Sequence, residues 1–415
     1  MFSVSDDCHA HGSVHDIKHK NTYEFPEEKI LAEEKRNMRI AFVGVGNISE
    51  IYLENITNMF REIEVIGVCD LIRERAEKAV EKYNIPKLYN DMYELFADDD
   101  VDIVLNITEA YNHYAVTKAA LEAGKNVYSE KPLATTLEQG KELVRLAKEK
   151  GVRLGGAPDT FLGGGIQTCR RLIEDGYIGD VFGGSIHMIC RGPEGWHPDP
   201  EAFYQPGAGP MFDMGPYYMT ALANLLGRCS KITGFSGRAH KERIIGSGPR
   251  YGQKIPVNVD TFVCGTMLFD SGAIVDSRIS FDVYCFTSDY AHIELYGTEG
   301  VLYVPDPNAF NGQIKIVRGN EGVMRELPTM YPYKDNCRGV GLADMAKAIR
   351  TGREHRCSNM QQLHVLEMME SFTTASREER VVTLETPYER GPIMDILIKM
   401  ISFCGTAQSG AANIL

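Results

Sequence analysis

Arg-Ile-Ala-Phe-Val-Gly-Val-Gly-Asn-Ile-Ser, residues 39–49, is the stretch that decides the fold of this chain. Residues 39–43 form an apolar run of the length of a buried strand, and residues 49–60 have the pattern of a helix. Between them the glycines have the spacing G-x-G-x-x-S. A strand, a glycine turn and a helix in this order predict the first unit of a parallel α/β sheet that binds a dinucleotide.

Each position of this turn has a physical task in such a site. Gly44 permits the tight turn, and Gly46 lets the backbone approach a pyrophosphate, while the small Ser49 allows the helix to pack closely on the strand. The free N–H groups of the helix N-terminus attract the phosphates. We therefore expect the cofactor to contact Gly44, Gly46, Asn47 and Ile48.

Asp70 ends the next apolar run and completes the pattern. A carboxylate there accepts hydrogen bonds from ribose hydroxyls and repels a 2′-phosphate, which favours NAD over NADP. Arg73 would instead favour NADP, because an arginine nearby can hold that phosphate. A strand-end cap is the alternative role of Asp70.

Strands and helices continue to alternate up to residue 160, and the strands are apolar throughout, at residues 64–69, 102–106, 126–129 and 152–156. This alternation predicts a parallel sheet covered on both faces, a Rossmann domain over residues 38–160. Longer strands with alternating polarity follow, with helices between them. They predict a second domain of α+β type over residues 161–390, built on a large, mostly antiparallel open sheet. Residues 1–37 are predicted to be an arm and residues 391–415 a tail.

Composition excludes several classes of protein. The net charge of −13 argues against a sequence-independent nucleic-acid binder, which needs a basic surface. No apolar run reaches the roughly 18 residues of a membrane span, and the ten cysteines are scattered, as in a reducing cytoplasm. The arm contains Cys8, His9, His11, His15 and His19, but their spacing fits no known metal pattern, so we predict no metal site.

The tripeptide Glu130-Lys131-Pro132 follows the strand of residues 126–129. The carboxyl ends of parallel strands form the rim of the ligand crevice, so Glu130 and Lys131 are expected beside the cofactor. Asn106, Thr108 and His113 follow the neighbouring strand and are expected near the nicotinamide half. The alternative for Lys131 is a surface lysine in a loop, and for His113 a structural role at a helix N-terminus.

The run Ala120-Leu121-Glu122-Ala123-Gly124-Lys125-Asn126-Val127-Tyr128-Ser129-Glu130-Lys131-Pro132-Leu133-Ala134 resembles the Gfo/Idh/MocA oxidoreductases, as do the glycine turn, Asp70 and residues 293–300. The resemblance covers roughly residues 38–390. It implies that Lys131 points at a substrate hydroxyl, that the Lys131-Pro132 bond is cis, and that the second sheet forms the interface of a homo-oligomer, a dimer or tetramer.

Residues 212–218 resemble the family's D-x-G-x-H element. Asp213 matches its Asp, whereas Tyr217 stands where many members have His, as in glucose–fructose oxidoreductase and dimeric dihydrodiol dehydrogenase. A spacing of four places both residues on one face of a helix. We expect Lys131 and Tyr217 to handle the proton, each with its pKa lowered by neighbouring positive charge, and Asp213 to orient the substrate or Lys131. Which of Lys131 and Tyr217 carries the proton stays open, and a helix N-cap is the alternative for Asp213.

The only tryptophan, Trp196, lies with His197 in the proline- and glycine-rich segment of residues 191–200. An aromatic ring with polar neighbours suits binding to the face of a carbohydrate, although the same sequence is also typical of a rigid surface loop. Asp159 and Gln167 are further candidates for substrate contact. The sequence thus predicts an NAD-dependent oxidoreductase acting on a secondary hydroxyl of a sugar, polyol or glycoside. A redox-neutral enzyme that breaks a glycosidic bond through transient oxidation, a trans-dihydrodiol dehydrogenase and a dinucleotide-sensing regulator are the alternatives.

Overall fold

The computed structural model describes residues 36–284, 292–319 and 322–395. Residues 1–36 and 37–415 form separate units, and only the second is described below. Almost all of the predicted arm and most of the predicted tail lie outside the described residues, so the arm's cysteine and histidines have no structural account.

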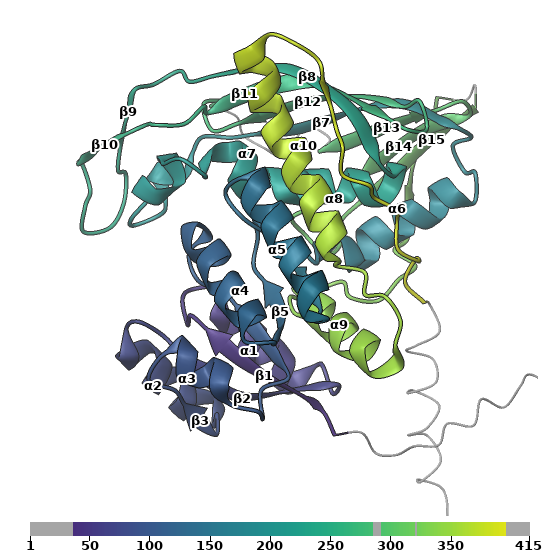
Figure 1. The fold of residues 1–415 in the computed structure, drawn as a ribbon. Helices are drawn as coiled ribbons and strands as arrows, with labels where there is room; N and C mark the ends of the chain where they lie inside the picture. Colours follow the sequence, from purple (N-terminus) through teal and green to yellow (C-terminus); the bar gives the residue numbers. More distant parts are fainter. Residues whose placement is uncertain (1–35, 285–291, 320–321, 396–415) are drawn as a thin grey trace, which may run out of the picture. The chain divides into compact units, whose positions relative to one another are not determined.

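The first part of the chain folds into a parallel sheet with the strand order β3-β2-β1-β4-β5-β6 (Figure 1). Its strands are β1 (Met38–Val43), β2 (Ile63–Cys69), β3 (Lys87–Leu88), β4 (Ile103–Asn106), β5 (Asn126–Ser129) and β6 (Leu154–Gly156). The helices between them are α1 (Ser49–Asn58), α2 (Arg73–Tyr83), α3 (Met92–Ala97), α4 (His113–Glu122) and α5 (Leu137–Lys150). The predicted Rossmann topology is confirmed.

Helices cover both faces of this sheet, as the apolar strands require. Ile40 and Phe42 of β1 pack in the cluster that contains α1 and α2, whereas Ala41 and Val43 face the cluster with α3, α4 and α5. The sequence analysis missed β3 and α3. Asp91 begins α3, because its side chain accepts hydrogen bonds from the backbone N–H groups of Tyr93 and Glu94.

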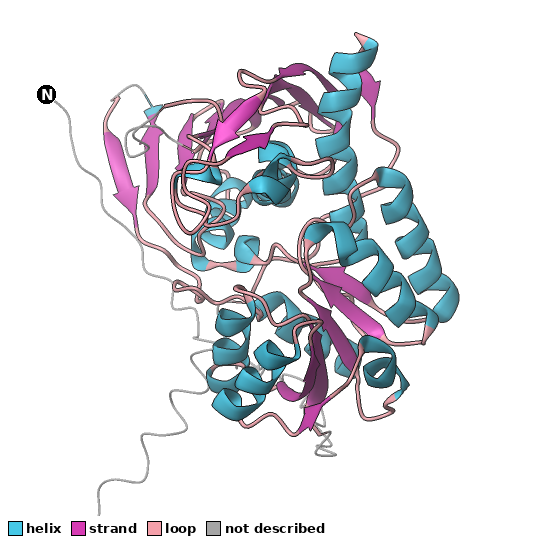
Figure 2. Ribbon diagram, turned by 90° about the vertical axis from the view of Figure 1, so that its left-hand side faces the viewer, coloured by secondary structure: helices cyan, strands magenta, loops and turns pink. Residues whose placement is uncertain are grey.

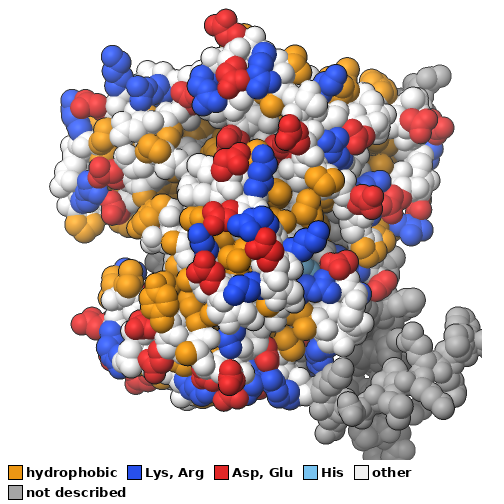
Figure 3. Space-filling view, viewed as in Figure 1, with side chains coloured by type: hydrophobic (Ala, Val, Ile, Leu, Met, Phe, Trp, Pro, Cys, Tyr) orange, Lys and Arg blue, Asp and Glu red, His pale blue; other side chains and the backbone are white. Residues whose placement is uncertain are grey.

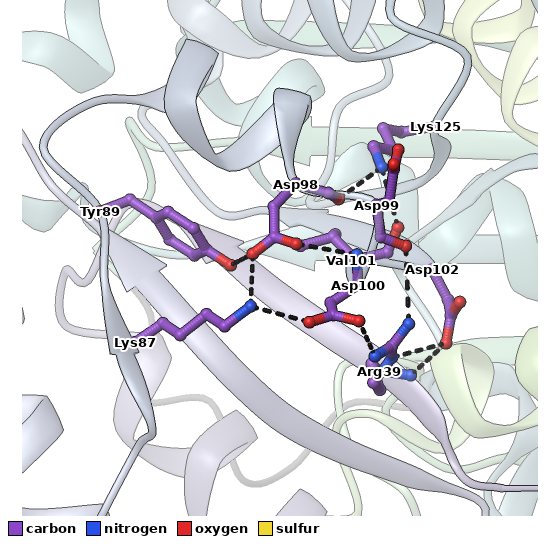
Figure 4. Close-up of polar contacts among 9 residues, drawn as sticks. All are labelled: Arg39, Lys87, Tyr89, Asp98, Asp99, Asp100, Val101, Asp102 and Lys125. Carbon is purple, nitrogen blue, oxygen red and sulfur yellow. Dashed lines mark hydrogen bonds and ion pairs between the residues drawn. The ribbon is translucent and has the colours of Figure 1, made fainter.

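A polar network pins the amino ends of these strands together (Figure 4). It consists of Arg39, Lys87, Tyr89, Asp98, Asp99, Asp100, Val101, Asp102 and Lys125. Asp98 is its centre and accepts hydrogen bonds from Lys87 at 2.6 Å and Tyr89 at 2.7 Å. Lys87 and Tyr89 together lower the pKa of Asp98 to about 2. The network lies at the edge opposite the carboxyl ends where ligands bind in such sheets, so its charges serve structure.

The second sheet has the strand order β16-β15-β14-β13-β7-β12-β11-β8-β17 among the described residues. Its strands are β7 (Val181–Ile189), β8 (Cys229–Gly237), β11 (Phe262–Phe269), β12 (Ile274–Ser280), β13 (Ile293–Gly297), β14 (Gly300–Val304), β15 (Ile314–Arg318), β16 (Met324–Leu327) and β17 (Val382–Thr383). Its described pairs are antiparallel except β7 with β12, which is parallel. The mostly antiparallel sheet is therefore confirmed, with one parallel pair inside it. A separate hairpin joins β9 (Glu242–Ile244) and β10 (Lys254–Pro256).

Helices lie on one face of this sheet, and the other face is open (Figure 2). The covering helices are α6 (Gly164–Glu174), α8 (Gly215–Leu226) and α10 (Asn359–Glu378). α10 also packs on α5, and α9 (Val340–Thr351) packs on β6, so the end of the chain returns to the first sheet. One buried apolar cluster consequently runs from β1 and α1 through these helices to β11 and β12.

Figure 3, drawn from the same side as Figure 1, shows hydrophobic side chains on this surface interspersed with charges of both signs. In the described part of the chain, no helix is both long enough and apolar enough to cross a bilayer.

Candidate active site

The glycine turn has the shape that a dinucleotide needs. Gly44 has a φ of +93°, and a β-carbon there would lie 3.0 Å from the carbonyl oxygen of Ile107. A β-carbon at Gly46 would instead have no atom within 4 Å, so the space in front of this backbone is open. Ile48 is the N-cap of α1 and has no polar side chain, so the N–H groups of the first turn after Ser49, whose own N–H donates to Gly46 O at 3.0 Å, have no side-chain cap and are left as donors for an anion. The turn therefore fits a pyrophosphate.

Asp70 is held at the carboxyl end of β2 by two backbone donors. Its carboxylate accepts hydrogen bonds from Val45 N at 2.6 Å and Ile72 N at 2.7 Å. Each oxygen keeps a further lone pair for a ribose hydroxyl. Arg73 is engaged elsewhere, because it donates to Glu77 and to Asn90 at 3.0 and 3.1 Å. The Asp70 carboxylate can thus accept from a ribose hydroxyl, whereas the Arg73 guanidinium is already hydrogen-bonded to Glu77 and Asn90.

Asn106, Thr108 and His113 form an internal network beyond β4. The Asn106 amide donates to His113 O and to Thr117 Oγ1, and its oxygen accepts from Thr108 Oγ1 at 2.8 Å. Asn106 is fully buried, so its side chain shapes the loop, and its burial does not support the predicted direct cofactor contact. Thr108 is only partly buried and keeps the position at the rim that the sequence predicted.

His113 connects this loop to the Lys131-Pro132 turn. Its Nδ1 lies 2.8 Å from Pro132 O and its Nε2 lies 2.9 Å from Thr108 O. Burial lowers the pKa of His113, although both backbone contacts act to raise it. Because the ring is 1% exposed, the structure gives it the structural role that the sequence left as the alternative to cofactor contact.

Glu130 and Lys131 follow β5, and the Lys131-Pro132 peptide bond is cis, which confirms that expectation. The Glu130 carboxylate accepts from Tyr52 Oη of α1 at 2.7 Å and from the backbone N of Lys131 at 3.0 Å. Glu130 therefore holds the Lys131 backbone in place from the helix of the glycine turn. The sequence analysis missed Tyr52, because a buried tyrosine in an amphipathic helix reads as core.

Lys131, Asp213 and Tyr217 meet, although they come from different parts of the chain. Lys131 Nζ donates to the backbone oxygen of Asp213 at 2.8 Å and to its Oδ1 at 2.9 Å. The same ammonium lies 5.2 Å from the centre of the Tyr217 ring. A cation at this distance from an aromatic face is attracted to it. The alternative of an isolated surface lysine is excluded by this geometry.

Asp213 and Tyr217 do not share one continuous helix, which corrects the prediction. Asp213 ends α7 (Gly209–Asp213), and Tyr217 lies in the first turn of α8, which begins at Gly215. Met214 is the N-cap of α8, so Asp213 is not a helix cap either. The break places the Asp213 carboxylate, and not only its backbone, against Lys131.

The charge state of Lys131 also differs from the expectation. Burial acts to lower the pKa of Lys131, but the negative charge of Asp213 and the hydrogen bond to it outweigh burial and raise the pKa above its usual range. The groups of the protein itself therefore keep Lys131 as an ammonium. The sequence analysis expected a lowered pKa for Lys131, and the groups of the protein do not produce it.

Asp159 and Gln167 are structural, and their predicted substrate contacts are corrected. Asp159 Oδ2 accepts from Gly339 N at 2.8 Å and Gly341 N at 3.0 Å, at the start of α9. Burial raises the pKa of Asp159 to about 6, against the lowering effect of those bonds. The Gln167 amide bridges Phe161 O and Met394 N. Both side chains are 1% exposed and have no access to a ligand.

Trp196 and His197 lie on the surface, next to each other. Trp196 is 68% exposed, and its ring meets the His197 ring edge-on, with the centroids 5.5 Å apart. Their loop is anchored underneath by buried Glu194, which pairs with Arg243 at 3.0 Å. The segment is thus an exposed aromatic platform on a rigid base, and a carbohydrate face and a rigid surface loop both stay predictions.

Arg338 lies near Tyr217; the sequence suggested it only by resemblance to the sugar-acting branch of the family, with a structural role as the alternative. Burial acts to lower the pKa of Arg338, but the nearby Tyr217 and Glu130 outweigh burial and raise it. Arg338 directly precedes the start of α9, far from Tyr217 in the chain. No local pattern marks such a contact, because it depends on how α9 docks.

Comparisons with known proteins agree with this fold. Residues 38–156 match the sequence model described as "Oxidoreductase family, NAD-binding Rossmann fold", and residues 166–303 match the "GFO/IDH/MocA C-terminal domain". The chain is 32% identical to an inositol 2-dehydrogenase from Salmonella typhimurium over 40% of its own length and 51% of the relative. It is 27% identical to a D-glucoside 3-dehydrogenase from Escherichia coli over 59% of its length and 70% of the relative.

Among solved structures, an aldose-aldose oxidoreductase from Caulobacter crescentus, complexed with glycerol, has the same fold. Its TM-score is 0.70 at 23% identity, over 84% of this chain and all (100%) of that one. The match to the Salmonella relative spans about half of that protein (51%). With both of its family domains matched in order, the chain belongs to the Gfo/Idh/MocA oxidoreductase family and carries its NAD-binding Rossmann domain.

Proposed function

We propose that this protein is an NAD-dependent dehydrogenase that oxidises a secondary hydroxyl group of a sugar, polyol or glycoside. The observation that carries the proposal is the meeting of Lys131, Asp213 and Tyr217 at the carboxyl edge of the Rossmann sheet. An ammonium, a carboxylate and a phenol together supply what alcohol oxidation needs from a protein: a group that holds the substrate oxygen and a group that takes its proton.

The cofactor would be held by the glycine turn and Asp70. Gly44, Gly46, Asn47 and Ile48 would cradle the pyrophosphate at the start of α1. Leu71, fully exposed beside Asp70, offers an apolar surface for the adenine. Thr108 and the Glu130-Lys131 turn would border the nicotinamide, which, when bound, takes the hydride from the substrate carbon. We expect NAD to be preferred to NADP, because Asp70 repels a 2′-phosphate and Arg73 is already paired with Glu77.

Lys131 would act as a hydrogen-bond donor in this mechanism. Asp213 occupies two of its three N–H groups and keeps it charged, so one N–H remains for the substrate oxygen. A cation on that oxygen stabilises the alkoxide that develops as the proton leaves. Asp213 would then set the direction of the ammonium, and Tyr217, as a tyrosinate, would receive the proton.

The substrate class rests on the family and on the surface around the site. The relatives named above act on inositol and on D-glucosides. Trp196 and His197 would support the apolar face of a sugar ring or of the group attached to it. Which sugar is accepted would depend on such contacts, since the Lys131 site itself recognises only a hydroxyl group.

The test is a panel of sugars, inositols and glycosides with NAD, followed by NADH absorbance, beside mass spectrometry of any cofactor that the purified protein retains. Lys131→Met should leave NAD binding intact and reduce turnover by about a thousandfold or more. Lys118→Met, which removes a surface lysine paired with Glu142, is the matched control. Near-normal turnover of Lys131→Met would refute the catalytic role of Lys131. Retained NAD with product formation but no net NADH would move the function to the redox-neutral alternative.

We also expect a homo-oligomer formed through the open face of the second sheet. This face carries exposed Phe235, Phe262 and Ile274 on neighbouring strands, with exposures of 75%, 37% and 55%. Phe235→Asp should shift the mass measured by light scattering to that of a smaller assembly, and an unchanged mass would exclude this face. The seven described cysteines are free thiols, which is consistent with the expected cytoplasmic location.

A further inference from the structure

The open face of the second sheet (Figure 2) carries opposite charges next to each other. Side chains alternate along a strand, and Val275 and Ile279 of β12 are buried in the core under the helices. Asp276 and Arg278 of the same strand therefore lie on the open face, where both are exposed. Neither side chain forms an ion pair or a hydrogen bond with another described residue. Both charges are thus available on the face through which we expect the homo-oligomer to form.

The register of the strands extends these two charges into rows that run across the sheet. Asp276 lies beside Ser185 of β7, and Ser185 lies beside Glu294 of β13, so two carboxylates flank one small hydroxyl. Arg278 lies beside His187 of β7, one row further along the strands. We call these the acidic row (Glu294, Ser185 and Asp276) and the basic row (His187 and Arg278). The two rows are neighbours on the same face, because their residues are two apart along each strand.

Exposed apolar side chains surround the two rows. Phe235 of β8 continues the row of Arg278, through Cys264 of β11. Ile274 lies beyond the acidic row and Phe262 beyond the basic row. A face of nine described strands, about 4.8 Å apart and about 20 Å long on average, measures roughly 800 Å², the area that each partner gives to a stable interface. Charges buried in such an interface cost free energy unless each one meets an opposite charge.

The direction of the two-fold axis decides which rows meet. When two copies pack face to face, the axis lies in the plane between the sheets, and a residue on one side of it contacts the residue at the same distance on the other side. An axis along the strands would place each row opposite itself, with carboxylates against carboxylates. An axis across the strands, between the two rows, would instead place the acidic row of each copy opposite the basic row of the other. The charges therefore favour the axis across the strands.

We propose that two copies of this chain pack through the open face with the axis across the strands, so that Arg278 of each copy pairs with Asp276 of the other. The proposal rests on the homo-oligomer of the proposed function and adds the residues and the symmetry that specify it. The ion pair occurs twice in the interface, once on each side of the axis. In the same arrangement His187 of one copy lies opposite Ser185 of the other, between the carboxylates of Asp276 and Glu294.

The test reverses the two charges and measures assembly by light scattering and native mass spectrometry. Arg278→Glu and Asp276→Arg should each raise the dissociation constant about a hundredfold or more, because like charges then meet across the axis. The two single variants mixed, one of them carrying a mass tag, should associate with each other, since each supplies the charge that the other needs. The double variant Arg278→Glu/Asp276→Arg should assemble with itself. Both combinations should return to within about tenfold of the wild-type constant.

Arg171→Glu is the matched control, because it reverses an exposed charge on α6, on the side of the sheet that the helices cover. Its assembly should equal that of wild type. Melting temperatures are measured for all variants. Where a reversal does not fold, Arg278→Gln, Asp276→Asn and their double variant decide, because a true pair makes the double variant no weaker in assembly than either single one.

Two results would overturn the proposed pairing. One is that the mixed single variants stay apart. The other is that Asp276→Arg binds wild type more tightly than wild type binds itself, which would indicate an axis along the strands. If Phe235→Asp breaks the assembly and the charge reversals do not, the proposed homo-oligomer stands and this pairing fails, whereas a monomeric wild type refutes both.

Discussion

Asp159 offers a direct test of how the buried end of α9 is stabilised. Its carboxylate is 1% exposed and accepts two backbone hydrogen bonds, yet burial raises its pKa from 3.8 to about 6. A raised pKa means that the folded protein binds this proton more tightly than the unfolded chain does. The free energy of unfolding must then fall as the pH rises from about 4 to about 6.

This difference in pKa corresponds to about 3 kcal/mol over the full range. About half of this lies between about pH 7.5 and about pH 5, the range in which the protein can be handled. Asp159→Asn keeps an oxygen for the two N–H groups but cannot ionise. Lowering the pH over this range should therefore stabilise wild type relative to the variant by about 1.5 kcal/mol.

The assay is urea unfolding followed by circular dichroism, at both pH values, for wild type and Asp159→Asn. The difference between the two proteins is the informative quantity, because His113, His355 and His364 also titrate with lowered pKa values in folded protein. Asp180→Asn, which removes an exposed carboxylate, should show no change in this difference. An equal difference between wild type and Asp159→Asn at both pH values would refute the reasoning.

Two further predictions concern the cofactor site. Asp70→Ser should weaken NAD binding by roughly tenfold to a hundredfold, because charge-assisted hydrogen bonds are lost, and should improve NADP binding relative to NAD binding. Calorimetry with both cofactors measures the two affinities. An unchanged ratio of these affinities would remove Asp70 from the site. Gly46→Val should keep the melting temperature but weaken NAD binding more than tenfold, because its side chain enters open space. Gly44→Ala should instead lower the melting temperature, since φ is +93° and the Ile107 oxygen is 3.0 Å away. Equal melting behaviour of the two glycine variants would contradict this reading of the turn.

The Rossmann part of the fold follows closely from local sequence patterns. The predicted strand at residues 126–129 has the bounds that the structure shows. Such segments are determined by apolar periodicity and by glycine turns, which act over a few residues. The two-residue strand β3 was missed because Lys87 and Leu88 carry no such pattern and join the sheet only by pairing with β2.

The second half of the fold has features that local sequence patterns do not predict. The sequence predicted one helix that holds both Asp213 and Tyr217 and runs to about Leu226, but the chain breaks at Met214, and the signal for the break is Pro216, which suits the first turn of a new helix. The parallel pairing of β7 with β12 joins segments about ninety residues apart, which no local pattern specifies. Asp159 was placed with the substrate for the same reason: its partners Gly339 and Gly341 are distant in sequence.

The proposed site divides its work by charge. Asp213 occupies two of the three N–H groups of Lys131 and keeps it protonated, so the ammonium is suited to hold the substrate oxygen and poorly suited to remove a proton. Tyr217 presents its aromatic face to the same ammonium, which lies 5.2 Å from the ring centre. In the proposed function, Tyr217 is therefore the group left to take the proton, as a tyrosinate.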